Sequence, residues 1–309
     1  MNNICTLSDK NYALYGLCLY ESLLETTNKD FMLHYLCLDD ETMDIMDLPQ
    51  IKSYHINDYK KFNDFEILRQ NNKSTPNGLS SWHFALASYF VHKLINVHHV
   101  NNCLYVDSDI MFYNDVSNII SECDKHSVGL MTHKHMTYRN ILNKLDVGYY
   151  NVGLVFFNND EYGIFASDWW KNVVITPNNI WHDSLGQCWD QKYLEGFHIF
   201  LPNNRIFVID TIFGHGAPWN YSHLKFDYNN NKLKWIDDVG CLTDQTNIYE
   251  QDLYFIHFSH FTPDFPNDKY NMDRSGEFCN TKIQNRQDIK WFYDDYFDKL
   301  KKIKQKYGI

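Results

Sequence analysis

The sequence lacks the features that mark a membrane-spanning, secreted or nucleic-acid-binding chain. Its 309 residues contain no apolar run of about 18 residues, the length that a helix needs to cross a bilayer. The N-terminus, MNNICTLSDKNY, has neither the basic start nor the apolar core of a signal peptide. Acidic residues outnumber basic ones, 39 to 28, which argues against a general nucleic-acid binder. We expect a cytoplasmic protein with no nucleic-acid partner.

Paired cysteine motifs and linkers are also absent. None of the eight cysteines forms a CxxC, and several lie inside apolar runs, as reduced core thiols do. No repeat, low-complexity segment or linker divides the chain, and its length suffices for one large α/β domain. We predict a main domain over residues 1–270 and a small C-terminal extension over residues 271–309 that ends in an amphipathic helix.

Apolar periodicity predicts strands that alternate with helices. We expect strands at residues 3–7, 31–38, 51–56, 103–106, 127–132, 149–157, 203–210 and 254–258, and a hairpin at 225–237. We expect helices at residues 14–24, 80–95, 161–171, 182–194 and 289–307, and a glycine-rich loop at 214–221. Such alternation indicates parallel βαβ units in a Rossmann-like α/β sheet flanked by helices.

The strongest chemical signal is LYVDSDIMFYND, residues 104–115. An apolar strand ends in Asp107 and Asp109, and a spacing of two on an extended backbone puts both carboxylates on one side. Two adjacent carboxylates repel each other unless a cation lies between them, and oxygen-rich sites suit Mg²⁺ or Mn²⁺. An isolated Asp-x-Asp is more often an Asx turn, so the metal interpretation depends on the motifs that follow.

Further polar motifs lie at predicted strand ends. In a nucleotide-binding α/β fold Asp9 would accept from a base N–H and Tyr12 would stack on the base, whereas the alternative is a helix cap. In FIHFSHF, residues 255–261, His257 is a candidate third metal ligand, although a structural role is open and His260 competes with it.

The strand YNVGLVFF and the helix predicted at 182–194 supply further candidates. Asn151 precedes the apolar run, and Gly153 would allow a ligand to approach the backbone closely; the alternative is a glycine bulge. Asp183 and Asp190 are seven residues apart and share one helical face, so either could point at a cleft, or simply into solvent.

Together, TLSDKNY, LYVDSD, YNVGLVFFNN, DQKYL and FIHFSHF resemble GT-A fold glycosyltransferases, especially family 8-like enzymes, in order and approximate spacing over residues 3–261. The resemblance implies a GT-A mixed sheet over residues 1–270. It implies a metal-dependent hexosyltransferase with a nucleotide-sugar donor, preferentially a UDP-sugar, and a carbohydrate, glycolipid or glycoprotein acceptor. The roles it implies are Asp9, Tyr12 and Ser108 on the donor, Asp107, Asp109 and His257 on Mn²⁺ or Mg²⁺, and Asn151, Asp190 and Gln191 near the transferred sugar.

The sequence departs from that pattern in two places. Family 8 enzymes usually carry an arginine on the helix before the Asp-x-Asp strand; here HFALASYFVHKL has none, so Lys93 or His92 would take its place at the donor. They also commonly follow the metal histidine with glycine and a phosphate-binding lysine, whereas this chain continues SHFTPDFP. Trp219 and Asn220 are assigned loosely to the acceptor side.

Two other function classes use similar residues. A nucleotidyltransferase acting on sugar phosphates would use the same carboxylate pair, but TLSDKNYALYG lacks its glycine-rich basic loop. A non-catalytic carbohydrate-binding protein on a decayed transferase scaffold is the third interpretation, against which the intact Asp107, Asp109, Asn151 and His257 argue. In an inverting transferase Asp190 would be the base, and in a retaining one Gln191 or a substrate oxygen would assist.

The last 21 residues, IKWFYDDYFDKLKKIKQKYGI, combine an aromatic stripe with five lysines near the end. One interpretation is a helix that packs the stripe on the domain, with lysines near the negative end of its dipole. The other is weak peripheral contact with an anionic membrane through the same stripe and lysines, which three aspartates would weaken.

Overall fold

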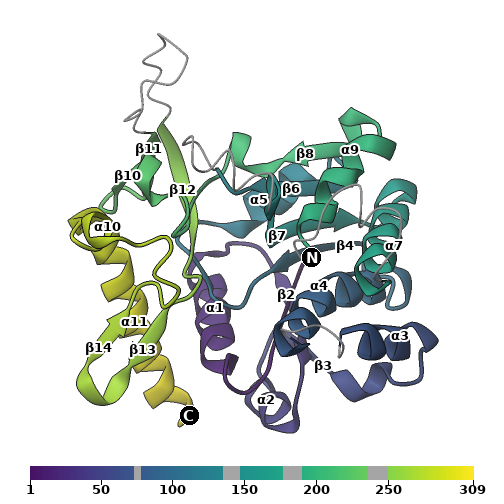
Figure 1. The fold of residues 1–309 in the computed structure, drawn as a ribbon, viewed down its shortest axis with the longest axis horizontal. Coiled ribbons are helices and arrows are strands. Elements are labelled where there is room, and N and C mark those ends of the chain that lie inside the picture. The colour runs from purple at the N-terminus through teal and green to yellow at the C-terminus, as the bar shows by residue number, and fades with distance from the viewer. Residues whose placement is uncertain (73–77, 135–146, 177–189, 236–249) are drawn as a thin grey trace.

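A computed structural model shows a central sheet between two helical layers, with a second sheet beside it (Figure 1). It describes residues 1–72, 78–134, 147–176, 190–235 and 250–309. The strands are β1 (Asn2–Ser8), β2 (Phe31–Cys37), β3 (Ile51–His55), β4 (Asn102–Val106), β5 (Ile110–Phe112), β6 (Val128–Thr132), β7 (Tyr150–Asn158), β8 (Ile206–Val208), β9 (Gly214–Gly216), β10 (Leu224–Asp227), β11 (Lys232–Trp235), β12 (Glu250–His257), β13 (Thr262–Asp264) and β14 (Lys269–Asn271). The α-helices are α1 (Ala13–Thr26), α2 (Asp40–Ile45), α3 (Asn63–Asn72), α4 (Gly78–Asn96), α5 (Val116–Cys123), α7 (Glu161–Ile175), α9 (Phe197–Phe200), α10 (Thr281–Gln284) and α11 (Gln287–Tyr307).

The central sheet is mixed and has the order β3-β2-β1-β4-β7-β6-β8. Strands β1, β2, β3 and β4 run parallel, as the alternation of strands and helices predicts. Strand β7 runs antiparallel to both β4 and β6, which makes the sheet mixed. The carboxyl ends of β1 and β4 therefore lie side by side at one edge, where ligands bind in open α/β sheets.

Both faces of the central sheet are buried, because each strand sends alternate side chains to opposite sides. In β4, Leu104 and Val106 join the core formed with α1, α5 and α11, and Cys103 and Tyr105 join the core under α3, α4 and α7. Such strands appear in sequence as nearly continuous apolar runs. The six cysteines that the structure describes are all buried and free, as predicted, whereas Cys188 and Cys241 lie outside the described residues.

Three predicted elements differ from the structure. The strand at 203–210 is reduced to β8 between two 3-10 turns, Asn203–Arg205 and Ile209–Thr211. The loop at 214–221 begins with β9, which pairs parallel with β12. Glycine permits this approach, because a Cβ at Gly214 would lie 2.6 Å from the carbonyl oxygen of Asp252 in β12. Most of the helix predicted at 182–194, with Asp183, lies outside the described residues, and its end is the 3-10 helix η2 (Lys192–Gly196).

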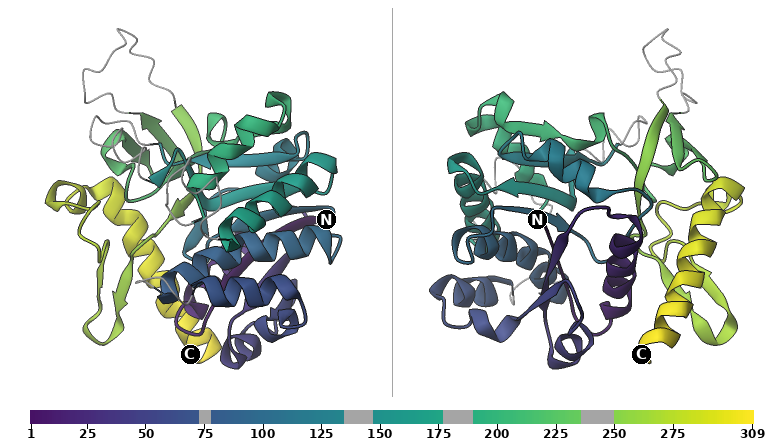
Figure 2. Two further views of the ribbon diagram at one scale, coloured as in Figure 1. Left: turned by 45° about the vertical axis from the view of Figure 1, so that its right-hand side comes forward. Right: turned by 180° about the vertical axis from the view of Figure 1, so that it is seen from behind.

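Helix α11 lies beside α1 (Figure 2), and its aromatic stripe is buried. The positions of this stripe are Ile289, Phe292, Tyr293, Tyr296, Leu300, Ile303 and Tyr307. Those up to Ile303 are at most 3 % exposed, and Lys299 and Lys306 pair with Glu25 and Glu21 of α1. The packing interpretation is therefore correct, and the stripe is not available to a membrane.

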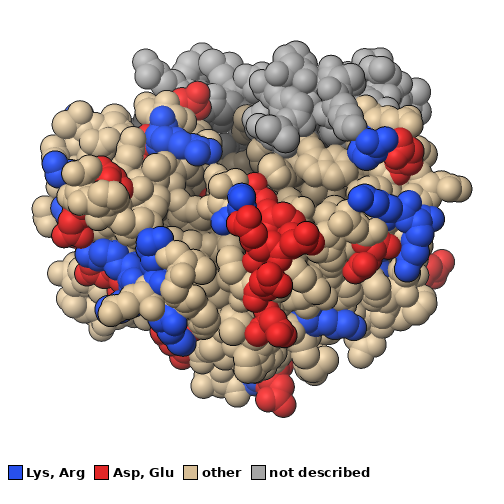
Figure 3. All heavy atoms as spheres, turned by 90° about the horizontal axis from the view of Figure 1, so that it is seen from below, with Lys and Arg blue, Asp and Glu red and all other residues tan. Residues whose placement is uncertain are grey.

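Seen from below, acidic side chains form a central strip with lysines and arginines to either side (Figure 3).

Helix length and polarity also bear on whether the chain could cross a membrane. Within the described parts of the chain, no helix is both long enough and apolar enough to span a bilayer. Peripheral contact with a membrane stays a prediction, and in α11 it would depend on the lysines because the stripe is buried.

Candidate active site

A cavity of about 840 Å³ opens where the carboxyl ends of β1 and β4 meet the end of β12. Its walls come from segments far apart in the sequence: the turn before α1, helix α4, the turn after β4, strand β7, the turn before η2 and the loop after β14. It brings together nine of the predicted site residues, which are Asp9, Tyr12, Asp107, Ser108, Asp109, Asn151, Asp190, Gln191 and His257.

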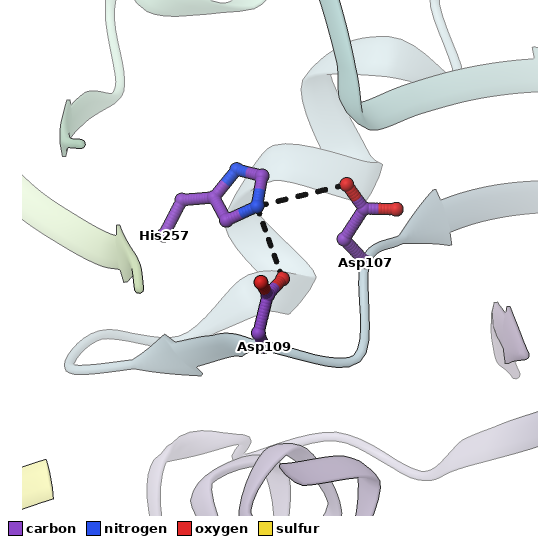
Figure 4. A group of neighbouring side chains, drawn as sticks. All are labelled: Asp107, Asp109 and His257. Carbon is purple, nitrogen blue, oxygen red and sulfur yellow. Dashed lines mark ion pairs between the residues drawn. The ribbon is translucent and has the colours of Figure 1, made fainter. Parts of the chain in front are cut away.

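Asp107, Asp109 and His257 form a compact cluster in this cavity, with both carboxylates turned toward the imidazole (Figure 4). Nε2 of His257 is 3.0 Å from Oδ1 of Asp109 and 3.6 Å from Oδ2 of Asp107. The carboxylates converge through a turn rather than through extended-strand spacing, because the N–H of Ile110 donates to the carbonyl of Asp107. The turn is held against β12, since the N–H of Phe258 donates to the carbonyl of Asp109.

The cluster suits a divalent cation. One ligand atom from each residue lies within 4.8 Å of the others, which is close to the span that a cation about 2.1 Å from each ligand requires. Burial raises the pKa of Asp107, and the charge of Asp109 adds to it. Burial alone would lower the pKa of His257, but the two carboxylates outweigh it and hold that pKa above its ordinary value. The centre of the cluster therefore favours positive charge.

Gly153 makes room for the imidazole. A Cβ at this position would lie 2.7 Å from Nδ1 of His257 and 2.5 Å from Oδ1 of Asn151, closer than real contacts. The glycine thus permits the close approach of His257. Gly153 also lines the cavity, and the approach of a ligand to its backbone stays a prediction. Asn151 completes the arrangement, because its Oδ1 accepts from the N–H of Gly153 at 2.9 Å.

The far end of the cavity holds amides and a buried acid. Nδ2 of Asn151 is 3.5 Å from Oε1 of Gln191 and 3.2 Å from Nε2 of His133. Asp190 is 3 % exposed, and its Oδ2 has no hydrogen-bond partner among the described residues. Burial, and then the charge of Asp107, raise the pKa of Asp190 well above its ordinary value. The indole N–H of Trp170 donates to the main-chain carbonyl of Asp190 and fixes its place.

Asp9 has a structural role as well as a place at the cavity. Its Oδ1 accepts from the N–H groups of Asn11 and Tyr12, at 3.0 and 3.2 Å, and its Oδ2 accepts from the side-chain amide of Asn11 at 3.1 Å. Asp9 therefore holds the turn before α1, whereas the N-cap of that helix is Tyr12. Tyr12 is 37 % exposed and lines the cavity, with its ring centroid 5.2 Å from that of Tyr15. The structure thus leaves a partly exposed aromatic ring at the cavity mouth.

Lys93 does not belong to the site, which corrects the prediction that it binds the donor. Its ammonium is 2.8 Å from Oδ2 of Asp64 and lies over the ring of Phe62, between α3 and α4. His92 also turns away, toward Asp168. The helix presents a different face to the cavity, on which His83 and its neighbours lie. Because the apolar residues of α4 form a nearly continuous run, the sequence does not show which face of the helix packs against α3 and α7.

Two further differences concern the loops. Trp219 lines the cavity with its ring edge-on to His257 at 5.2 Å, but Asn220 is buried and holds the turn by accepting from the N–H of Ala217. Sequence reasoning missed the loop after β14, which adds Arg274, Glu277 and a phenylalanine to the cavity. This loop lies beyond the last motif of the resemblance, and only the isolated arginine could have signalled it.

The chain has the GT-A fold. It matches a structure of the galactosyltransferase LgtC with donor and acceptor sugar analogues over 96% of this chain and 94% of that one, with 16% identity and a TM-score of 0.52. Apo mouse xyloside xylosyltransferase 1 matches over 72% and 90%, with 14% identity and a TM-score of 0.51. In sequence, the chain is 23% identical to the uncharacterised protein YfnF of Bacillus subtilis (strain 168) over 236 residues, 74% of this chain and 75% of that protein. No protein-family model matches the chain.

Proposed function

We propose that the protein is a metal-dependent glycosyltransferase that moves a sugar from a nucleoside-diphosphate donor to a carbohydrate, glycolipid or glycoprotein acceptor. The observation that supports this most is the cluster of Asp107, Asp109 and His257, which opens into a large cavity on a GT-A fold. Structural neighbours with this fold carry glycosyltransferase names, and the cavity is large enough for a nucleotide-sugar.

The donor end of the proposed site comprises the metal cluster and the turn before α1. Tyr12 would stack on the base. Oδ2 of Asp9, which accepts one hydrogen bond from the side-chain amide of Asn11, would also accept from a base N–H, which suits a uridine nucleotide. Asp107, Asp109 and His257 would hold Mn²⁺ or Mg²⁺, and the imidazole nitrogen favours the softer Mn²⁺. When bound, such a cation stabilises the negative charge on a departing diphosphate as a Lewis acid.

The sugar end comprises Asn151, Gln191 and Asp190. Positive charge develops at the anomeric carbon when the sugar–diphosphate bond breaks, so neutral amides and a carboxyl suit this centre better than cations. Because the pKa of Asp190 is raised, its carboxyl retains a proton more readily than an ordinary aspartate does and can donate a hydrogen bond to a sugar oxygen. In an inverting reaction it would be the base, and in a retaining one Gln191 or a substrate oxygen would assist.

Thermal unfolding with a panel of nucleotides tests this proposal. UDP, GDP, dTDP, CDP and CMP are each added with Mn²⁺ and, separately, with EDTA. At a concentration of 100 times its Kd, a ligand adds about 2.7 kcal/mol of stability, or about 4 °C for a chain of this size. We expect a metal-dependent shift with UDP and none with CMP. If no diphosphate shifts the midpoint with Mn²⁺, the proposal is wrong; a shift with GDP alone would contradict only the uridine assignment.

A further inference from the structure

The cavity is rich in acids and poor in cations. Among the described residues that line it, Arg274 is the only lysine or arginine. The acidic residues in the same lining are Asp9, Asp107, Asp109, Asp190 and Glu277. A divalent cation at the cluster would balance two of these carboxylates, but a nucleotide-sugar diphosphate brings about two further negative charges at neutral pH. One positive side chain is therefore left to face the diphosphate.

The guanidinium of Arg274 is not committed to a carboxylate. Three of the four arginines that the structure describes, Arg69, Arg205 and Arg286, form ion pairs with acids. Arg274 forms none among the described residues, and its guanidinium makes one long hydrogen bond, 3.4 Å, to the hydroxyl of Tyr12. An arginine that pairs with no carboxylate of the described residues is available to an anionic ligand in this acidic cavity, and its planar fork fits two phosphate oxygens at once.

The main chain of Arg274 is tied to the metal cluster. Its N–H donates to the carbonyl of His260, at 3.0 Å, three residues after the candidate metal ligand His257. His260 itself has a left-handed backbone, with φ of 63°, which turns the chain toward β13 at this point. The arginine and the imidazole are therefore anchored through one short segment.

Asp273 holds the loop that presents the arginine. This carboxylate is 3 % exposed and accepts from the N–H groups of Ser275, Phe278 and Cys279 at 3.0, 2.8 and 3.0 Å, and from the hydroxyl of Ser275. With its neighbour fixed in this way, Arg274 loses less conformational freedom when it binds a ligand.

We infer that Arg274 binds the diphosphate of the donor, beside Tyr12 and in the cavity that contains the metal cluster, and holds the diphosphate as it departs. This inference rests on the proposed function. Charge-assisted hydrogen bonds from an arginine predict that Arg274→Gln weakens the binding of a nucleoside diphosphate on the order of 10- to 100-fold. Arg274→Lys, which keeps the charge but not the fork, should recover part of the loss.

Calorimetric titration in Mn²⁺ tests the assignment with UDP, GDP, dTDP and CDP and with the nucleoside of whichever binds best. We expect Arg274→Gln to weaken binding of the diphosphate and to leave the affinity for the nucleoside unchanged. Arg69→Gln, an exposed arginine on α3, is the matched control and should change neither. Both variants should unfold at the wild-type temperature, because neither side chain is buried.

The outcomes distinguish the assignment of Arg274 from the proposed function. If the wild type binds a diphosphate and Arg274→Gln binds it as tightly, the Arg274 assignment is wrong and the proposed function stands. An equal loss of affinity for the diphosphate and for the nucleoside would place the arginine at the base and would also overturn the assignment. If the wild type binds none of the diphosphates, both claims fail together.

Discussion

The change Gly153→Ala tests whether the metal cluster depends on the space behind the imidazole. The added methyl would lie 2.7 Å from Nδ1 of His257, so the ring must move by about 0.7 Å to reach an ordinary contact of 3.4 Å. Metal–ligand distances tolerate about 0.2 Å. We therefore expect the variant to bind Mn²⁺ on the order of 10- to 100-fold more weakly, the range found when the surroundings of a metal ligand are disturbed.

Overpacking also destabilises the fold, so a matched control is needed. Gly129→Ala on the adjacent strand β6 would place a methyl 2.8 Å from Sγ of Cys123, away from the cluster. Both variants should lose about 1–3 kcal/mol of stability, which is roughly 2–5 °C. Only Gly153→Ala should lose Mn²⁺ affinity, as measured by calorimetry at a temperature where both are folded. Equal Mn²⁺ affinities in the two variants would refute the account of the glycine.

Three further predictions concern acid stability, the buried acid and the terminal helix. Burial, with the charges of Lys52 and His98, lowers the pKa of His34 to about 4, so the unfolded chain binds more protons than the folded one as the pH falls below about 6.5. This residue should therefore cost about 2 kcal/mol of stability between pH 7 and pH 5, and the difference between the urea midpoints at these two pH values should shrink in His34→Gln. Asp190→Asn should reduce turnover on the order of 100-fold without lowering the unfolding temperature, because one oxygen of the buried carboxyl has no hydrogen-bond partner in the described parts of the chain; unchanged turnover would remove Asp190 from the mechanism. Since the aromatic stripe of α11 is buried, any binding to anionic vesicles should vanish in 0.5 M NaCl, and binding that persists there would contradict this packing.

The sequence predicted the framework well because its signals are local. Apolar runs bounded by polar turns located β1, β2, β3, β4 and β7 to within about one residue, and the buried faces of these strands explain why the runs are continuous. The motifs at Asp9, Asp107 and His257 were predicted to meet, and they do, since the carboxyl ends of neighbouring strands fix where such residues lie.

The misplaced residues depend on packing over long distances. Whether Lys93 faces the cavity depends on Asp64, which is distant in sequence and supplies its partner. Asn220 was assigned to the acceptor but serves the turn that carries Trp219. Arg274 reaches the cavity only because β13 and β14 fold back and Asp273 organises the loop. None of these contacts leaves a pattern in the local sequence.

The most direct test of the central claim is release of nucleoside diphosphate from UDP-sugars by the wild type and by Asp109→Asn. Asp109 is chosen because its carboxylate lies 3.0 Å from the imidazole of His257, at the centre of the proposed metal site. With Mn²⁺ present, the wild type should release UDP from at least one sugar donor, EDTA should stop the release, and Asp109→Asn should lower the rate by roughly 100-fold or more while unfolding at a similar temperature. A folded Asp109→Asn protein that retains full, Mn²⁺-stimulated activity would contradict the account.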